Sequence, residues 1–107
     1  MFDFGDAKRI EWPITKRGIK YSLHSENEGA TICTAELFGK TWFEVFEKRV
    51  NKEYEIAGNV IPAKEAFPPD EAFGKWARCV NTIEAANFWA RELADKVHER
   101  ANRDSLA

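Results

Sequence analysis

The sequence predicts an α+β fold: an antiparallel sheet of four to five strands, a meander, packed by one long C-terminal helix. Between residues 19 and 50, apolar and polar side chains alternate in short runs separated by turn residues, as strands require. From residue 82 onward no proline or glycine occurs, and apolar residues recur at helical spacing. A chain of 107 residues fits one compact domain, and no second core is expected.

Residues 1–18 are expected to form an N-terminal arm. Gly5 interrupts any periodic pattern, and the Trp12–Pro13 step favours an extended or turned backbone at Trp12. The arm carries four large apolar side chains that are unfavourable to leave in water: Phe2, Phe4, Ile10 and Trp12. We therefore expect the arm to pack across the domain or to dock onto a second copy of the chain.

Three strands are expected to follow the arm in a meander. Residues 19–24 alternate in polarity, and the polar run Ser25–Gly29 is typical of a hairpin loop. Residues 30–38 form the second strand and residues 41–50 the third, with short loops that favour antiparallel pairing. The third strand has apolar residues on both faces, so we expect it to be central or covered by the arm.

The next segments are less regular. Residues 54–62 are predicted as a fourth strand, bent or bulged at Gly58–Asn59. A loop follows, with one helical turn over Asp70–Phe73 that begins after Pro69. Residues 75–80 are predicted as a short strand.

The C-terminal helix is the clearest element. Asn81 is predicted as its N-cap, with Glu84 completing a capping box. One narrow stripe holds the core-facing residues Ile83, Ala86, Ala90, Leu93, Ala94, Val97 and Ala101. Residues 104–107 are expected to fray, so the single domain is placed at residues 19–103.

Phe88 lies nearly opposite this stripe and suggests an interaction surface, because aromatic residues are enriched at interfaces. Coverage by the arm and simple exposure are the alternatives. The leading hypothesis is a non-enzymatic protein–protein interaction module, whose partner is another protein or a second copy of the chain, as a homodimer. Its predicted contact residues are Phe2, Phe4, Trp12 and Phe88.

The charge balance argues against a dedicated nucleic-acid-binding protein. The chain has 16 basic and 18 acidic residues, whereas such domains usually carry a clear basic excess. The alternative hypothesis is nevertheless a nucleic-acid-binding accessory protein that uses two local basic groups. They are Lys16, Arg17 and Lys20, and Lys48, Arg49 and Lys52. The competing interpretation is that these are ordinary solvated charges.

Few residues suggest catalysis, a cofactor or a metal. Cys33 and Cys79 form no CxxC pair and are expected to be free, buried thiols. The histidines, His24 and His98, belong to no metal-binding motif, and no glycine-rich phosphate-binding loop occurs. A pairing of His24 with Cys33 or Ser22 across a hairpin is the one nucleophilic arrangement to consider. No enzyme, cofactor or metal is therefore predicted.

Three carboxylates, Glu36, Glu44 and Glu47, could cluster across paired strands, as an acid–base or metal site requires. Basic residues lie between them in the sequence, so we expect ordinary solvated ion pairs. The longest stretch without a charged residue, Ile56–Ala63, has eight residues, far short of the roughly 20 of a membrane span. Charged residues near the start exclude an apolar secretory signal, and a cytoplasmic location is expected.

Four segments carry a resemblance to known sequences. They are Trp42–Phe43–Glu44–Val45–Phe46, Ile61–Pro62–Ala63–Lys64–Glu65, Asp70–Glu71–Ala72–Phe73–Gly74–Lys75–Trp76–Ala77 and Thr82–Ile83–Glu84–Ala85–Ala86. In these segments the chain is similar to short uncharacterised proteins of bacteriophages and mobile elements, over roughly residues 14–94. The resemblance implies a small accessory protein that acts by binding, and it assigns no activity, cofactor or site residue.

Overall fold

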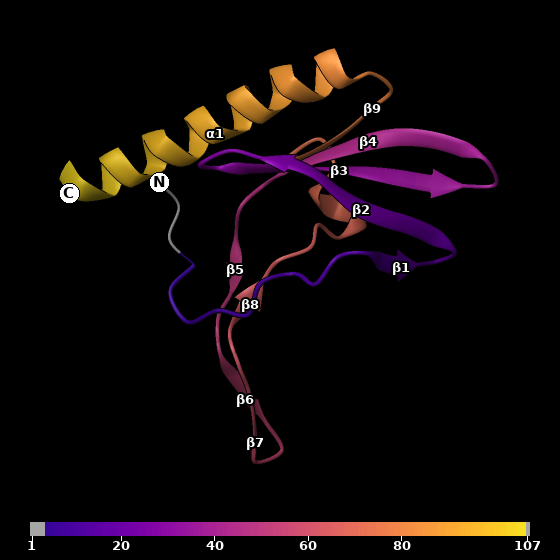
Figure 1. The fold of residues 1–107 in the computed structure, drawn as a ribbon. Coiled ribbons are helices and arrows are strands. Elements are labelled where there is room, and N and C mark those ends of the chain that lie inside the picture. The colour runs from indigo at the N-terminus through magenta and orange to yellow at the C-terminus, as the bar shows by residue number, and fades with distance from the viewer. Residues whose placement is uncertain (1–3, 107) are drawn as a thin grey trace.

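The structure is a computed structural model in which residues 4–106 are described. The bounds of its elements are β1 (Ile14–Lys16), β2 (Ile19–Glu26), β3 (Ala30–Leu37), β4 (Lys40–Glu47), β5 (Val50–Asn51), β6 (Tyr54–Ile56), β7 (Asn59–Ile61), β8 (Lys64–Glu65), the 3-10 turn η1 (Asp70–Ala72), β9 (Ala77–Val80) and α1 (Ile83–Leu106). An antiparallel sheet in the order β1-β2-β3-β4-β9 has α1 across one face (Figure 1). The predicted fold class is confirmed, including the meander β2–β3–β4.

Three hairpins are closed by the same two-residue turn. Arg17–Gly18 joins β1 to β2, Phe38–Gly39 joins β3 to β4, and Ala57–Gly58 joins β6 to β7. Both residues of each pair have positive φ, from 50° to 81°. Such turns match the natural twist of paired strands, and the second position needs glycine because it has no Cβ.

The predicted fourth strand over residues 54–62 is wrong. The turn at Ala57–Gly58 reverses the chain there, so the segment forms a separate two-stranded hairpin, β6–β7, that does not join the main sheet. The smaller pair β5–β8 lies at its base. The main sheet gains its first strand instead from β1, which belongs to the segment that the sequence analysis assigned to the arm.

Helix α1 begins one residue later than the capping box predicted. The Thr82 hydroxyl accepts a hydrogen bond from the Ala85 amide at 3.2 Å, so Thr82 and not Asn81 acts as the cap. Residues 104–106 continue the helix, where the sequence analysis expected a frayed tail. The helix approaches the β2–β3 loop closely, because a Cβ on Gly29 would lie 2.9 Å from the Ala94 Cα.

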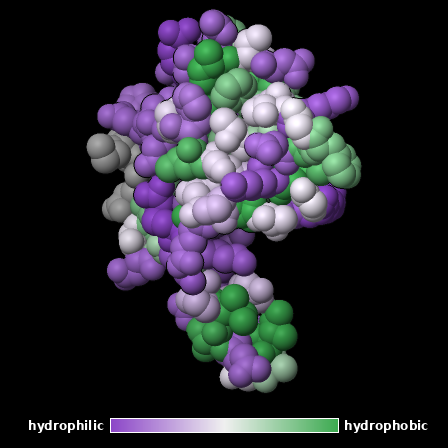
Figure 2. Space-filling model, turned by 45° about the vertical axis from the view of Figure 1, so that its right-hand side comes forward, coloured by the Kyte–Doolittle hydropathy of each residue, from purple (hydrophilic) through white to green (hydrophobic). Residues whose placement is uncertain are grey.

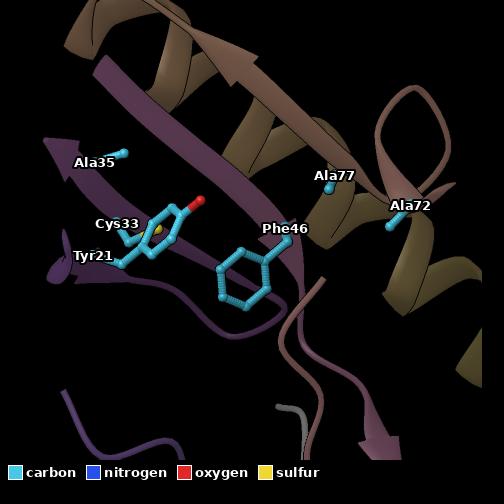
Figure 3. Close-up of a cluster of buried hydrophobic side chains, with 6 residues drawn as sticks. All are labelled: Tyr21, Cys33, Ala35, Phe46, Ala72 and Ala77. Carbon is cyan, nitrogen blue, oxygen red and sulfur yellow. The ribbon is translucent and has the colours of Figure 1, made fainter. Parts of the chain in front are cut away.

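Both faces of the sheet are covered. On the α1 side the buried cluster comprises Ala30, Ile32, Val45, Ala86, Ala90 and Leu93. On the far side it comprises Tyr21, Cys33, Ala35, Phe46, Ala72 and Ala77 (Figure 3). Ile10 and Trp12 of the arm pack against the far-side cluster. The described part of the arm therefore covers its own domain, which is the first of the two predicted placements.

Polar contacts fasten the arm to β8. The backbones of Lys8 and Glu65 are joined by a hydrogen bond of 2.7 Å from the Glu65 amide. The Glu65 carboxylate, only 2% exposed, accepts hydrogen bonds from Arg9 Nε at 2.8 Å and from the Ile10 amide at 2.9 Å. Arg9 also pairs with Glu26 of β2 at 3.0 Å. One buried carboxylate thus anchors the arm.

The two cysteines differ. Cys33 lies in the central strand β3 and is buried, as predicted. Cys79 is exposed, so the prediction that it is buried is wrong. The reason is its place on β9, the last strand of the sheet, where no further strand covers the edge.

Candidate functional site

The β6–β7 hairpin projects from the body of the domain. Residues 51–60 are all exposed, a run of ten. Within it, Tyr54, Ile56 and Val60 are 50%, 58% and 59% exposed. Figure 2 shows the segment as a protrusion below the body, with hydrophobic atoms gathered around its end. Grouped apolar exposure of this kind marks interaction sites in soluble proteins.

The strand register determines which side chains share a face of the hairpin. Tyr54 is paired with Ile61, Glu55 with Val60, and Ile56 with Asn59. Directly paired residues lie on the same face, and neighbours along a strand alternate. Tyr54, Ile56 and Ile61 therefore form one apolar face, which we call the hairpin face.

The hairpin has no covering element. Its two strands pair only with each other, so within the described part of the chain no third strand joins either edge. An isolated two-stranded hairpin is of marginal stability in water, and open edges with apolar side chains favour pairing with another surface. The hairpin is the best candidate for a docking element.

Sequence reasoning did not identify Tyr54, Ile56 or Val60 as interface residues. A local signal for them exists: Ala57–Gly58 is an X-Gly step between two short runs of strand-forming residues, like Arg17–Gly18 and Phe38–Gly39. It predicts a hairpin. The exposure of its apolar side chains depends on what lies nearby in space, which the local sequence does not encode.

The three predicted contact residues that the structure describes, Phe4, Trp12 and Phe88, do not form one patch. Phe2 lies outside the described residues. Phe4 is half-buried, with the Arg9 guanidinium 4.2 Å from its ring centroid. Trp12 packs beside Phe67 on the far side of the sheet, at a centroid distance of 6.2 Å. Phe88 is 47% exposed on α1, which covers the opposite side.

The two basic groups lie at opposite ends of the main sheet. Lys16, Arg17 and Lys20 lie where β1 and β2 meet, whereas Lys48 and Arg49 follow the other end of β4. Eight-residue strands separate these ends, a span of about 26 Å at roughly 3.3 Å per residue. The two groups therefore do not form one continuous basic cluster.

Three members of these groups are engaged in ion pairs. Arg17 pairs with Asp70 at 2.6 Å and Arg49 with Glu47 at 3.0 Å. Lys48 is buried and lies 3.7 Å from Glu26. Lys16, Lys20 and Lys52 are exposed. Cations already paired within the domain contribute little to phosphate binding, so this arrangement does not favour the nucleic-acid alternative.

The carboxylates are more buried than predicted. Glu36 is exposed, but Glu44 and Glu47 are 6% and 1% exposed, so the expectation of solvated ion pairs is wrong for these two. Both lie on β4, an inner strand with its two faces covered. Glu47 is compensated by Arg49, and Glu44 accepts a hydrogen bond of 2.9 Å from Trp42 Nε1.

Glu44 lines a pocket of about 190 Å³ between the β1–β2 turn and the segment around η1. Tyr21, Phe67 and Phe73 form much of its apolar wall. Burial raises the pKa of Glu44, and the hydrogen bond from Trp42 opposes this only in part. Arg17, hydrogen-bonded to Asp70 at the same pocket, lowers the pKa of Asp70.

Two titratable side chains near Glu44, Tyr21 and Cys33, keep their protons. Burial raises the pKa of the Tyr21 hydroxyl to about 12 and that of the Cys33 thiol to about 12. A protonated thiol is a poor nucleophile. His24 is exposed on β2, with its Nδ1 2.9 Å from Ser25 Oγ, and its ring contacts Phe43. No contact joins it to Cys33 or Glu44 among residues 4–106, so the pocket has a carboxyl group without an activated nucleophile.

Glu44→Gln is expected to raise the thermal unfolding midpoint at pH 8 and to leave it unchanged below pH 4. The folded-state pKa of Glu44 is raised above its ordinary 4.5, so the protonated side chain makes its full contribution to stability below pH 4.5. As the pH rises through the folded-state pKa, the carboxyl group must ionise in a buried site and that contribution to the free energy of unfolding is lost. Glutamine removes the buried charge and keeps an oxygen for Trp42. Scanning calorimetry across this range, with exposed Glu36→Gln as the control, tests the expectation; equal midpoints at pH 8 would contradict it.

Among residues 4–99, whose side chains the structure describes, no group of three or more His, Cys, Asp or Glu side chains is arranged to hold a metal ion. No helix in the described part of the chain has the length and apolar character to cross a bilayer. The chain matches no family model, no curated protein and no solved structure. The resemblance to phage and mobile-element proteins therefore stays a prediction.

Proposed function

We propose that this chain is a protein–protein interaction module that acts by binding rather than by catalysis, with the β6–β7 hairpin as its contact element. One observation carries the proposal. The hairpin projects from the domain, and on the hairpin face the apolar side chains of Tyr54 and Ile56 are exposed by half or more. Burial against a partner would remove these groups from water, which is the dominant favourable term in association.

The charge around the hairpin favours a protein over a lipid surface as the partner. Glu53 and Glu55 flank the apolar residues, with Lys52 as the one cation of the hairpin segment 52–61. Anionic lipid headgroups repel carboxylates and attract basic clusters. The same carboxylates repel phosphate. A partner with an apolar groove and a basic rim fits this surface.

The test is site-specific photocrosslinking from the hairpin face. A benzophenone amino acid in place of Tyr54 is expected to capture a defined protein in native cells, to be identified by mass spectrometry. The purified protein should then bind the Tyr54→Thr/Ile56→Thr variant at least tenfold more weakly than the unmodified chain. Threonine suits this variant because its β-branched side chain retains strand preference while it removes most apolar surface.

Two matched variants make this result specific. Phe38→Asn removes the most exposed apolar side chain in the described residues, 94% exposed at the β3–β4 turn, and asparagine tolerates the positive φ there. Val60→Thr changes the opposite face of the hairpin. Both should bind like the unmodified chain, or nearly so. Equal binding by the Tyr54→Thr/Ile56→Thr variant would overturn the proposed contact element.

A further inference from the structure

A groove lies beside the base of the hairpin. It has a volume of about 380 Å³ and is formed where the arm crosses β5 and β8. Ile10, Ile14 and Phe67 provide its apolar lining, and each of them is only half-buried. The hairpin leaves the domain at the Asn51–Lys64 pair, and both residues line the same groove.

The groove and the hairpin face are apolar surfaces on one chain, separated by the length of the hairpin. From Asn51 to the turn at Ala57 the chain advances six residues, about 20 Å at roughly 3.3 Å per residue. When two identical hairpins lie side by side in opposite directions, the tip of each reaches the base of the other. Each tip then lies at the groove of the second copy, and a two-fold axis passes near the middle of the hairpins.

The charges of the two surfaces are complementary. The hairpin segment 52–61 has one basic and two acidic residues, a net charge of −1. The groove is lined by three basic residues, Lys8, Arg9 and Lys64, and by two acidic ones, Glu11 and Glu65, a net charge of +1. Lys64 is exposed and has no ion-pair partner among the side chains that the structure describes. Attraction of this kind acts over distances beyond direct contact.

The size of the contact also favours a reciprocal arrangement. The two half-exposed side chains of the hairpin face, Tyr54 and Ile56, offer far less area than the roughly 800 Å² that a standard interface buries on each partner. In a two-fold arrangement each chain contributes both a hairpin and a groove, so the buried area doubles. The second hairpin also provides the neighbour that an isolated two-stranded hairpin lacks.

We propose that the partner bound by the hairpin is a second copy of this chain, in a two-fold dimer whose hairpins lie antiparallel, each tip in the apolar groove of the other copy. This inference rests on the proposed function, since it names the partner of the same contact element. It assigns a role to Ile10, Ile14 and Phe67 as the receiving surface.

The oligomeric state of the purified chain tests the dimer. Sedimentation velocity is expected to give twice the single-chain mass of 12.3 kDa. The Tyr54→Thr/Ile56→Thr variant should dissociate at concentrations at least tenfold higher than the unmodified chain, while Phe38→Asn should not differ from it. A circular dichroism spectrum that matches the unmodified chain confirms that each variant is folded.

Crosslinking tests the antiparallel geometry. In a Cys79→Ser background, Ile61→Cys places a thiol on the hairpin face beside Tyr54, near the proposed two-fold axis, and a short bis-maleimide should join two chains there. Phe38→Cys, an exposed position at the far end of the sheet, should give no such product. Covalent dimers from both positions, or from Phe38→Cys alone, would overturn the arrangement.

The failures of the two proposals are distinguishable. A single-chain mass at every concentration overturns the dimer, and so does a dimer that is unchanged in the Tyr54→Thr/Ile56→Thr variant. If photocrosslinking then captures a different protein in a hairpin-dependent manner, the proposed function stands without the dimer. If neither a second copy nor another protein depends on the hairpin, both proposals are wrong.

Discussion

Phe46→Ala is expected to lower the free energy of unfolding by about 3–5 kcal/mol, the range for deleting a buried aromatic ring. Phe46 is the largest fully buried side chain, with 0% exposure. Its ring lies 5.8 Å from that of Phe67. Phe46 is a member of the far-side cluster of buried side chains (Figure 3). Alanine would leave a cavity that the surrounding strands cannot close.

Urea denaturation measures this loss, and Phe38→Ala provides the matched control. Both variants delete the same atoms, but Phe38 is 94% exposed. Its free energy of unfolding should change by no more than about 0.5 kcal/mol, as for most surface substitutions. If Phe46→Ala lowered the free energy of unfolding by less than about 1 kcal/mol, the far-side cluster would not be a cooperative part of the core.

The elements that could be predicted are those set by local periodicity. Strands β2, β3 and β4 and helix α1 each have enough residues for their apolar pattern to identify one face. Within the helix, the predicted stripe includes Ala86, Ala90 and Leu93, all of which are buried. Closely spaced strands also pair with their neighbours in sequence, so the meander follows from the loops.

The features that could not be predicted depend on residues distant in sequence. Ile14–Lys16 is too short to show a pattern and becomes a strand only because β2 is beside it. The burial of Glu44 depends on cover from the segment around η1. In the sequence, the residues of the hairpin face resemble those of a buried strand. Only the fold shows that nothing covers Tyr54 and Ile56.

Glu65→Ala is expected to lower the free energy of unfolding by about 2–4 kcal/mol, because the buried Glu65 carboxylate is the hydrogen-bond acceptor for two donors of the arm, one of them the charged Arg9. Its side chain is 2% exposed and accepts hydrogen bonds from Arg9 Nε and the Ile10 amide. Alanine leaves the Ile10 amide without its acceptor and Arg9 with only Glu26. Urea denaturation gives the loss.

Two further substitutions separate the anchoring role of Glu65 from a general charge effect. Glu65→Gln keeps an acceptor oxygen and should lose less than Glu65→Ala. Glu11→Ala breaks the Lys8–Glu11 pair, 3.6 Å apart with both side chains largely exposed, and should change stability by less than about 1 kcal/mol. A loss from Glu11→Ala as large as that from Glu65→Ala would contradict the anchoring role.

The same substitution links stability to association. Glu65 holds Ile10 in place, and Ile10 lines the groove that receives the hairpin of the second copy. If the arm forms one wall of that groove, Glu65→Ala should weaken self-association even where the sheet remains folded, whereas Glu11→Ala, which only makes the groove more positive, should not weaken it. A dimer of unchanged affinity in Glu65→Ala, with the arm released, would show that the groove is not the receiving surface.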